Sequence, residues 1–291
     1  MRWVIAPSRP AQLLHVALIT TGPALGALGA VGWVATHAVA PSTWGVAAAL
    51  FVISVVGIEV GYHRLFSHGA FKAVPWLARA LQRSGAIAAQ GPALYWAALH
   101  RKHHAHSDTD EDPHTPHGVH GSFVRAHVGW MFEPPPEDLF ERIPDLLADR
   151  RFVRADRWYA AWAVAGLALP AGVGWLSGGG AEGAVEGLLI GGLLRVFVVQ
   201  HGIWSINSVC HLWGRRPFNS RDRSTNVPWL TWLTLGGSLH NTHHAFPFTA
   251  RNDLLPQSPD PGAWVISAFE RLGWVTEVKM PSADVVARHR A

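Results

Sequence analysis

Residues 44–68 read WGVAAALFVISVVGIEVGYHRLFSH, an apolar segment that leads directly into His63 and His68. A helix needs roughly 20 apolar residues to cross the hydrocarbon core of a membrane, because each residue rises only about 1.5 Å. Residues 44–62 have about that length, and Glu59 is their only charged residue. They therefore predict a membrane span with two histidines at its exit.

Three further segments have the same apolar character. The four predicted spans comprise residues 13–39, 44–62, 159–176 and 184–206. A turn around Pro41 joins the first two, and residues 177–182 join the last two, so the sequence predicts two helical hairpins. Neither connection contains Lys or Arg. We expect no cleavable signal peptide, because the first apolar run is too long for the apolar core of a signal sequence.

The cationic residues lie almost entirely in the N-terminus, in residues 63–158 and after His211. Cytoplasmic segments carry the excess of Lys and Arg, so both termini are expected in the cytoplasm. We predict an all-α integral membrane protein with four transmembrane helices in two hairpins. A cytoplasmic helical cap from residues 63–157 and 207–291 would complete a single domain over 1–291.

Composition excludes several classes of protein. With 49% hydrophobic and only 15% charged residues, the chain is too apolar for an ordinary soluble domain. The formal charge of +4 comes from basic residues beside apolar spans, which favours anionic membrane lipid over nucleic acid as a partner. The single cysteine, Cys210, excludes an internal disulfide and a cysteine-ligated iron–sulfur cluster in one chain.

Two amphipathic segments are expected on the cytoplasmic side. Residues 76–99 are apolar but interrupted by Arg79 and Arg83, which predicts a helix that covers the bundle. The alternative, a fifth span, would leave His63 and His100 on opposite sides of the membrane. Residues 262–274 predict a surface helix.

Nine of the 18 histidines form a pattern. They are His63, His68, His100, His103, His104, His211, His240, His243 and His244. On an α-helix, positions i, i+3 and i+4 lie within roughly 60° of one another. His100, His103 and His104 have this spacing, and so do His240, His243 and His244. Each of these two trios can therefore present its imidazoles to a common point. His63 and His68 converge only if their helix ends or bends between them. Asn207 shares a helix face with His211 and could reach the same site directly or through water.

This number of imidazoles indicates the kind of metal site. Imidazole suits Fe, Zn, Cu and Ni, and nine ligands exceed the four positions of a zinc site, so two metal ions are implied. Two irons can activate dioxygen into an oxidant that removes hydrogen from an unactivated C–H bond. The sequence therefore favours a non-haem di-iron oxygenase, although metal identity stays open.

Four motifs in this order resemble the membrane acyl-CoA desaturases of the stearoyl-CoA, Δ9 type, especially bacterial members. They are His63-Arg-Leu-Phe-Ser-His68, His100-Arg-Lys-His103-His104, Asn207-Ser-Val-Cys-His211 and His240-Asn-Thr-His243-His244-Ala-Phe-Pro247. The resemblance covers most of the chain, from the second span to the tail. The acidic run from Ser107 to His114 is also similar to the family's segment after its second motif.

The resemblance implies two Fe²⁺ ions held by the nine histidines, with Asn207 joined through water, and O₂ as co-substrate. The substrate would be a saturated fatty acyl thioester, an acyl-CoA, converted to a cis-Δ9 product. Electrons would come from a separate ferredoxin or flavoprotein reductase, since the chain has no motif for binding such a cofactor itself. The location implied is the bacterial inner membrane, with the active site on the cytoplasmic side.

Further residues acquire expected roles by matching position. Gln90, Trp96 and Trp204 are similar to residues near the family's bent acyl tunnel, with ordinary packing as the alternative. Asp108, Asp110 and Asp112 are candidates to orient ligating imidazoles, with a solvated acidic loop as the alternative.

The chain departs from the family's pattern at three places. The segment from Glu133 to Asp138 is acidic where animal enzymes carry basic residues suited to CoA phosphates, which leaves CoA or another carrier open. Residues 236–238 read Gly-Gly-Ser in place of a more usual Gly-Glu-Gly. Conversely, Glu59 lies one turn before His63 in an apolar span, where an acid is costly and usually functional. We therefore hypothesise that Glu59 orients a ligating imidazole.

Two other functions compete with desaturation. A fatty acyl or alkane hydroxylase would use a related histidine cage but leave oxygen on the substrate. A histidine-lined metal transporter should place its ligands along the spans, whereas only the isolated His15, His37 and His201 lie within them.

Overall fold

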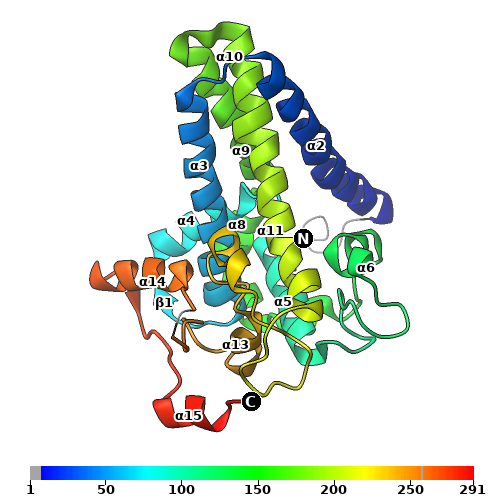
Figure 1. Ribbon diagram of the computed structural model, residues 1–291, viewed down its shortest axis with the longest axis vertical. Coiled ribbons are helices and arrows are strands. Elements are labelled where there is room, and N and C mark those ends of the chain that lie inside the picture. Colours follow the sequence, from blue (N-terminus) through cyan, green and yellow to red (C-terminus); the bar gives the residue numbers. More distant parts are fainter. Residues whose placement is uncertain (1–7, 257) are drawn as a thin grey trace.

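The computed structural model describes residues 8–256 and 258–291, which are predominantly helical. Long helices converge at one end of the molecule, and shorter helices and loops form a broad cap at the other (Figure 1). Residues 1–7, whose cytoplasmic placement the charge pattern predicts, lie outside the described residues.

The long helices occupy the four apolar segments. They are α2 (Arg9–Thr36), α3 (Pro41–Val56) continued by η1 (Gly57–Ser67), α9 (Tyr159–Gly174) continued by η4 (Trp175–Gly179), and α10 (Gly180–Glu186) continued by η5 (Gly187–Leu194) and α11 (Arg195–Leu212). Two helices, Arg9–Thr36 and Pro41–Ser67, are long and apolar enough to cross a membrane. A proline in the first turn of each suits a helix start, where its missing N–H would be unbonded anyway.

The cap is built from short elements. They are β1 (Lys72–Ala73), α4 (Pro75–Ala86), α5 (Ala93–His106), α6 (Phe123–His127), η2 (Gly129–Phe132), η3 (Leu139–Arg142), α7 (Pro144–Ala148), α8 (Arg150–Asp156), η6 (Pro228–Leu230), α12 (Thr231–Thr234), α13 (His240–Ala245), α14 (Pro261–Arg271), β2 (Val275–Thr276) and α15 (Ala283–Arg288). The two strands pair antiparallel. Helix α14 confirms the surface helix predicted at residues 262–274.

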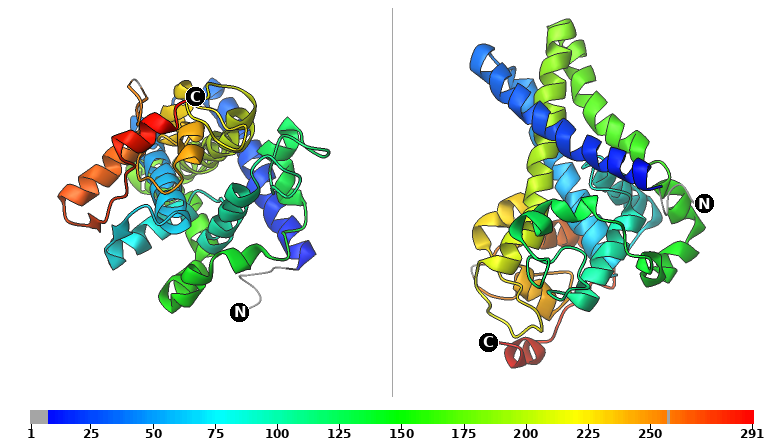
Figure 2. Two further views of the ribbon diagram at one scale, coloured as in Figure 1. Left: turned by 90° about the horizontal axis from the view of Figure 1, so that it is seen from below. Right: turned by 90° about the vertical axis from the view of Figure 1, so that its right-hand side faces the viewer.

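The single covering helix predicted over residues 76–99 is wrong. The chain forms two helices there, because α4 ends at Ala86 and α5 begins at Ala93. Gly91 has a φ of +93°, which a residue with a side chain rarely adopts, and Pro92 precedes the first turn of α5. The break redirects the chain so that α5 lies in the cap beneath the long helices (Figures 1 and 2).

The second and fourth long segments fix the cap to the bundle through close packing and buried polar groups. A Cβ atom on Gly57 would lie 2.1 Å from the backbone nitrogen of Gly85, so only glycine lets η1 and α4 approach this closely. The guanidinium of Arg195 in α11 donates to the carbonyl oxygens of Ile87 and Gly166 at 2.7 and 2.8 Å. These bonds satisfy a buried cation and tie three segments together.

Candidate metal centre

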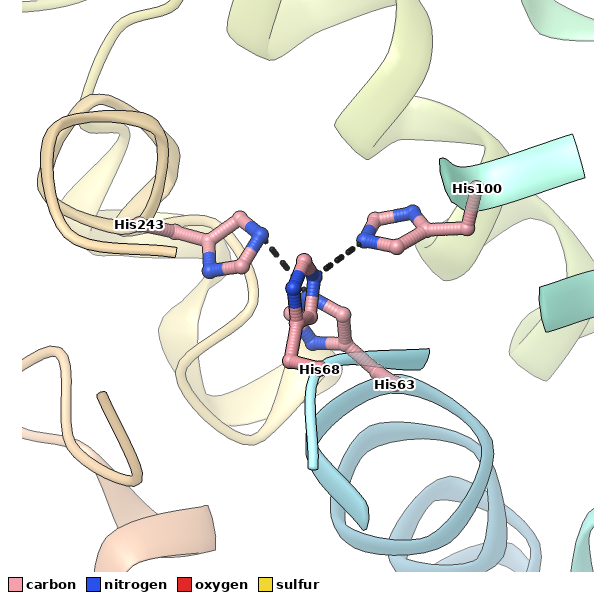
Figure 3. Close-up of side chains that lie close together, drawn as sticks. All are labelled: His63, His68, His100 and His243. Carbon is pink, nitrogen blue, oxygen red and sulfur yellow. Dashed lines mark hydrogen bonds between the residues drawn. The ribbon is translucent and has the colours of Figure 1, made fainter. Parts of the chain in front are cut away.

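The first imidazole cluster consists of five histidines from three elements. They are His63 and His68 at the end of η1, His100 and His104 on α5, and His243 on α13. Figure 3 shows four of these side chains pointing toward a common point. The Nε2 atoms lie 3.0 Å apart between His63 and His243, and 2.7 Å apart between His68 and His100. The Nε2 atom of His104 lies 2.8 Å from that of His243 and 3.1 Å from that of His100.

The second imidazole cluster consists of His103 on α5, His211 on α11, and His240 and His244 on α13. The Nε2 atom of His240 lies 3.0 Å from those of His211 and His244. His103 closes the group at 3.3 Å from the Nε2 atom of His244. The nine predicted histidines therefore meet in two adjacent groups.

The structure explains how His63 and His68 come together. The helix widens in η1, and its end is marked by a bond from the amide of His68 to the carbonyl oxygen of His63. A helix with hydrogen bonds to the fifth residue places residues five apart on nearly the same face. The two rings consequently lie 5.0 Å apart between their centroids.

The expectation that each histidine trio faces one common point is wrong in detail. Helix α5 directs His100 and His104 to the first cluster but His103 to the second. Helix α13 likewise directs His243 to the first and His240 to the second. Because i, i+3 and i+4 differ in direction by tens of degrees, one helix can serve two adjacent points.

The donor atoms fit metal ions. Nitrogen ligands at about 2.1 Å from one ion and at right angles lie about 3.0 Å apart, which matches the observed spacing. Burial lowers the pKa values of His100, His104 and His243 well below the ordinary value, so these imidazoles are neutral near pH 7, as metal ligation requires. Each of the two clusters could therefore hold a metal ion.

Carboxylates contact the outward-facing Nδ1 atoms of several rings. Asp112 lies 3.0 Å from Nδ1 of His103, Asp108 lies 3.0 Å from Nδ1 of His211, and Glu59 lies 3.0 Å from Nδ1 of His63. Such a contact fixes which nitrogen carries the proton and leaves Nε2 free. Burial lowers the pKa of His103, but the charge and hydrogen bond of Asp112 together with the charges of Asp108 and Asp222 outweigh it, and the pKa is raised overall.

One of the expected acids does not reach the centre, and an unexpected one does. Asp110 is exposed, and its carboxylate accepts from the backbone amide of Val119. Asp222, which no sequence motif singles out, lies 2.7 Å from Nδ1 of His244. No local spacing links this loop residue to a histidine motif, so only the tertiary structure finds it.

Known proteins resemble the chain over most of its length. The family model described as fatty acid desaturase matches residues 41–258. The chain belongs to the fatty acid desaturase family. It is consequently an oxidoreductase of fatty acyl metabolism.

Relatives of this desaturase differ in the substrate that their names state. It is 36% identical over 284 residues to hex-5-enoyl-(acyl-carrier protein) acetylenase of Moorena producens (strain JHB), covering 94% of this chain and 88% of that protein. It is 34% identical to the sn-2 palmitoyl-lipid 9-desaturase of Nostoc sp. (strain 36), covering 77% and 76%. It is 33% identical to the acyl-CoA C20 Delta5-desaturase of Anemone leveillei, covering 84% and 77%.

A cavity adjoins the first cluster of the desaturase. Its lining includes His100 together with all four residues expected near the substrate or the metal, namely Gln90, Trp96, Trp204 and Asn207. Trp96 stacks on the ring of His100 with 4.9 Å between centroids. The buried Nε2 atom of Gln90 has no hydrogen-bond partner among the described residues, which makes it a free donor at the cavity wall.

A second cavity of about 250 Å³ adjoins the first. The two share Ile19 and Gln90 among their lining residues, and the second extends between the start of α2 and Tyr159 at the start of α9. The sequence did not single out Ile19, because an isoleucine in an apolar helix carries no local signal. We refer to these two adjoining, mainly apolar cavities as the passage; the first of them reaches the imidazole of His100.

The acidic segment after Trp130 pairs with basic residues of the desaturase's own cap. Glu133 forms an ion pair with Arg125 at 2.8 Å, and Asp138 forms ion pairs with Lys102 and Arg142. Each of these three cations thus has a carboxylate partner within the protein, with Asp138 shared by two of them.

Proposed function

We propose that the chain catalyses the O₂-dependent desaturation of a saturated fatty acyl chain, with two iron ions held by the nine histidines. The observation that carries the proposal is the meeting of nine Nε2 atoms in two groups beside an apolar cavity. Two irons bound there would supply the dioxygen chemistry that removes hydrogen from an unactivated C–H bond. Asn207, which lines the same cavity as His100, would join the centre through water.

The protein itself positions the ligating imidazoles and the acyl chain, and it excludes water from the reacting carbons. Neutral, buried imidazoles hold their donor atoms in place, and carboxylates such as Asp112 and Asp108 fix the ring orientations. Trp96 and Trp204 line the cavity beside the cage and exclude water from the reacting carbons. Gln90 offers a donor to a polar atom of the acyl group. The passage would thus decide which methylene groups face the ions, and with them the chain length and bond position.

The finer substrate assignment is a cis-Δ9 desaturation of an acyl-CoA thioester. Its support is the order and spacing of the four sequence motifs, whereas the internally paired cations near Glu133 leave acyl-carrier protein and lipid esters as competing carriers. Electrons would come from a separate ferredoxin or flavoprotein reductase.

Product analysis tests the reaction. The purified desaturase, loaded with iron and supplied with a reductase, is incubated with stearoyl-CoA, the matching acyl-carrier protein thioester and a membrane lipid ester. A monoenoic product with a cis-Δ9 bond from stearoyl-CoA supports the full proposal, and its absence in His103→Ala ties it to the centre. A hydroxylated product would favour the related hydroxylase reaction. If only the acyl-carrier protein thioester or the lipid ester is converted, that carrier would replace CoA in the proposal.

We also propose that the four long helical segments cross the bacterial inner membrane as two hairpins, with both termini and the cap in the cytoplasm and all of residues 1–291 in one domain. Two of the helices meet the length and hydropathy needed. The single native cysteine, Cys210, is buried and gives a low background for labelling. An impermeant maleimide added to intact cells should label Glu182→Cys in the second hairpin turn but not Ala291→Cys at the C-terminus; the reverse pattern would contradict this orientation.

A further inference from the structure

A buried ionic group joins η1 to Asp260, the residue that precedes α14. Glu59, only 2% exposed, places Oε2 3.0 Å from Nδ1 of His63. Its Oε1 accepts from Nε and Nη2 of Arg64 at 3.0 and 2.8 Å. Arg64 in turn makes two bonds of 2.9 Å to Asp260, which is fully buried. Glu59 is therefore held by Arg64 while it orients His63.

Gly237 lies directly against this carboxylate. A Cβ atom built on Gly237 would be 2.9 Å from Oε2 of Glu59 and 2.8 Å from the terminal methyl carbon of Ile206. The φ of Gly237 is not in the left-handed region, so backbone conformation does not require glycine there. What requires it is space, because the Glu59 carboxylate occupies the place of a side chain at 237.

We propose that Glu59 is a positioning residue for His63, and that one carboxylate can fill this role from either of two positions in the chain, 59 or 237. A glutamate at 237 would begin 2.9 Å from the point that Oε2 now occupies, which a carboxyl two bonds farther along its side chain can reach. A glutamate at 237 would then accept the hydrogen bonds from His63 and Arg64 in place of Glu59. Only one of positions 59 and 237 can carry the acid, since a glutamate at 237 would collide with the Glu59 carboxylate and repel it.

The chemistry explains why one acid is needed. Without it, Nδ1 of His63 loses the acceptor that keeps its proton there and leaves Nε2 for an ion. Arg64 would also keep only Asp260 as a charged partner in a buried place, where an incompletely compensated charge is costly. Any carboxylate within reach of both groups restores both conditions, whichever of the two segments carries it.

The test rests on the proposed metal centre and uses cobalt(II) as the probe. The full-length protein in detergent is stripped of metal and titrated with cobalt(II), whose visible absorption reports each ion bound. Glu59→Ala should lower the affinity for one of the two cobalt(II) ions by about 10- to 100-fold and leave the affinity for the other unchanged. Glu59→Ala with Gly237→Glu should recover most of that affinity, whereas Gly237→Glu alone should lose it.

A gentler pair of variants covers the case in which the charged exchange disturbs folding. Gly237→Ala should weaken the same ion in the wild-type background, because its methyl group displaces Glu59, but should have no further effect in Glu59→Ala. Additive effects in this cycle would overturn the proposal. So would a double exchange that stays as weak as Glu59→Ala, or that does not fold.

These outcomes separate the pairing from the centre itself. If the wild-type chain takes up fewer than two ions, the proposed di-metal centre fails. If it takes up two and Glu59→Ala binds both as tightly as wild type, only the role of Glu59 fails. Glu59→Gln, which keeps the size of the side chain, serves as a conservative control and should weaken the ion less than Glu59→Ala.

Discussion

Asp222 accepts a hydrogen bond of 2.7 Å from Nδ1 of His244, whose Nε2 atom lies 3.0 Å from that of His240. The same carboxylate accepts from the backbone amide of Ser224, so the loop around residue 222 holds it in place. Burial lowers the pKa of His244 to about 4 despite the neighbouring charge of Asp222, so this imidazole is neutral near pH 7. A loop remote in sequence thus orients a proposed ligand.

We expect Asp222→Asn to weaken metal binding at the second cluster by about 10- to 100-fold, the usual cost of losing a carboxylate behind a ligating imidazole. Iron per chain after dialysis against a weak chelator measures the effect. Asp110→Asn is the matched control, because this exposed acid accepts a hydrogen bond from the amide of Val119 and none from a histidine among the described residues. Equal iron retention in the two variants would contradict the role given to Asp222.

The two clusters should lose metal separately. His104→Ala removes a donor from the first cluster, and His240→Ala removes one from the second. Each variant should retain roughly one iron per chain where the parent retains two, since two ions are proposed. His120→Ala, at an exposed position in the loop after α5, should retain both. Loss of both ions from either cluster variant would indicate one shared site instead of two.

Blocking the passage should reduce turnover without removing metal. Ile19 lines both cavities, and Ile19→Trp would fill the region between them. Overpacking typically costs about 1 to 3 kcal/mol, which corresponds to a roughly 5- to 150-fold lower equilibrium constant for binding the acyl chain. We expect a loss of that size in product formation from a long acyl substrate, with iron content unchanged. Leu18→Trp places the same ring on the exposed side of α2 and should leave turnover intact.

Asp156 should make the stability of the protein depend on pH. Burial raises the pKa of its carboxyl to about 6, although the amide of Ala93 donates to Oδ1 at 2.8 Å. The folded state therefore holds a proton that the unfolded chain releases near its ordinary pKa of about 4. This contribution is fully present below that value and is lost as the pH rises through about 6, which lowers the free energy of unfolding by about 3 kcal/mol.

Asp156→Asn removes that dependence, because an amide does not ionise. Denaturant unfolding in detergent should show wild type becoming less stable between about pH 4 and about pH 7, while the variant follows a flatter line. The variant should therefore gain most, relative to wild type, above pH 6. Parallel pH profiles for the two proteins would show that Asp156 is not responsible.

Local patterns were sufficient to predict the long helices and the nine histidines. Apolar length specified helices such as Arg9–Thr36, and motif spacing identified His63 through His244 as one set. The break between α4 and α5 was missed even though Gly91-Pro92 is a turn signal, because the apolar pattern on both sides suggested continuity.

Features that depend on segments far apart could not be predicted. The division of α5 and α13 between two clusters depends on how these helices cross, which their own spacing leaves open. Asp222 and the residue Ile19 have no motif around them, since their roles come from loops and helices that meet only in the folded chain. The widening of η1, which unites His63 with His68, likewise required the structure.

The contact between His63 and His243 joins positions 180 residues apart. An ion held between them would tether the start of the cap to its C-terminal part. Closing so long a loop reduces the conformational entropy of the unfolded chain more than closing a short loop does. Chelation should then raise amide exchange in α13 and the loops around it, while α2 and α3 keep their protection. In a cell that is short of iron, the cap, which is proposed to face the cytoplasm, would be the part of this protein that proteases cleave first.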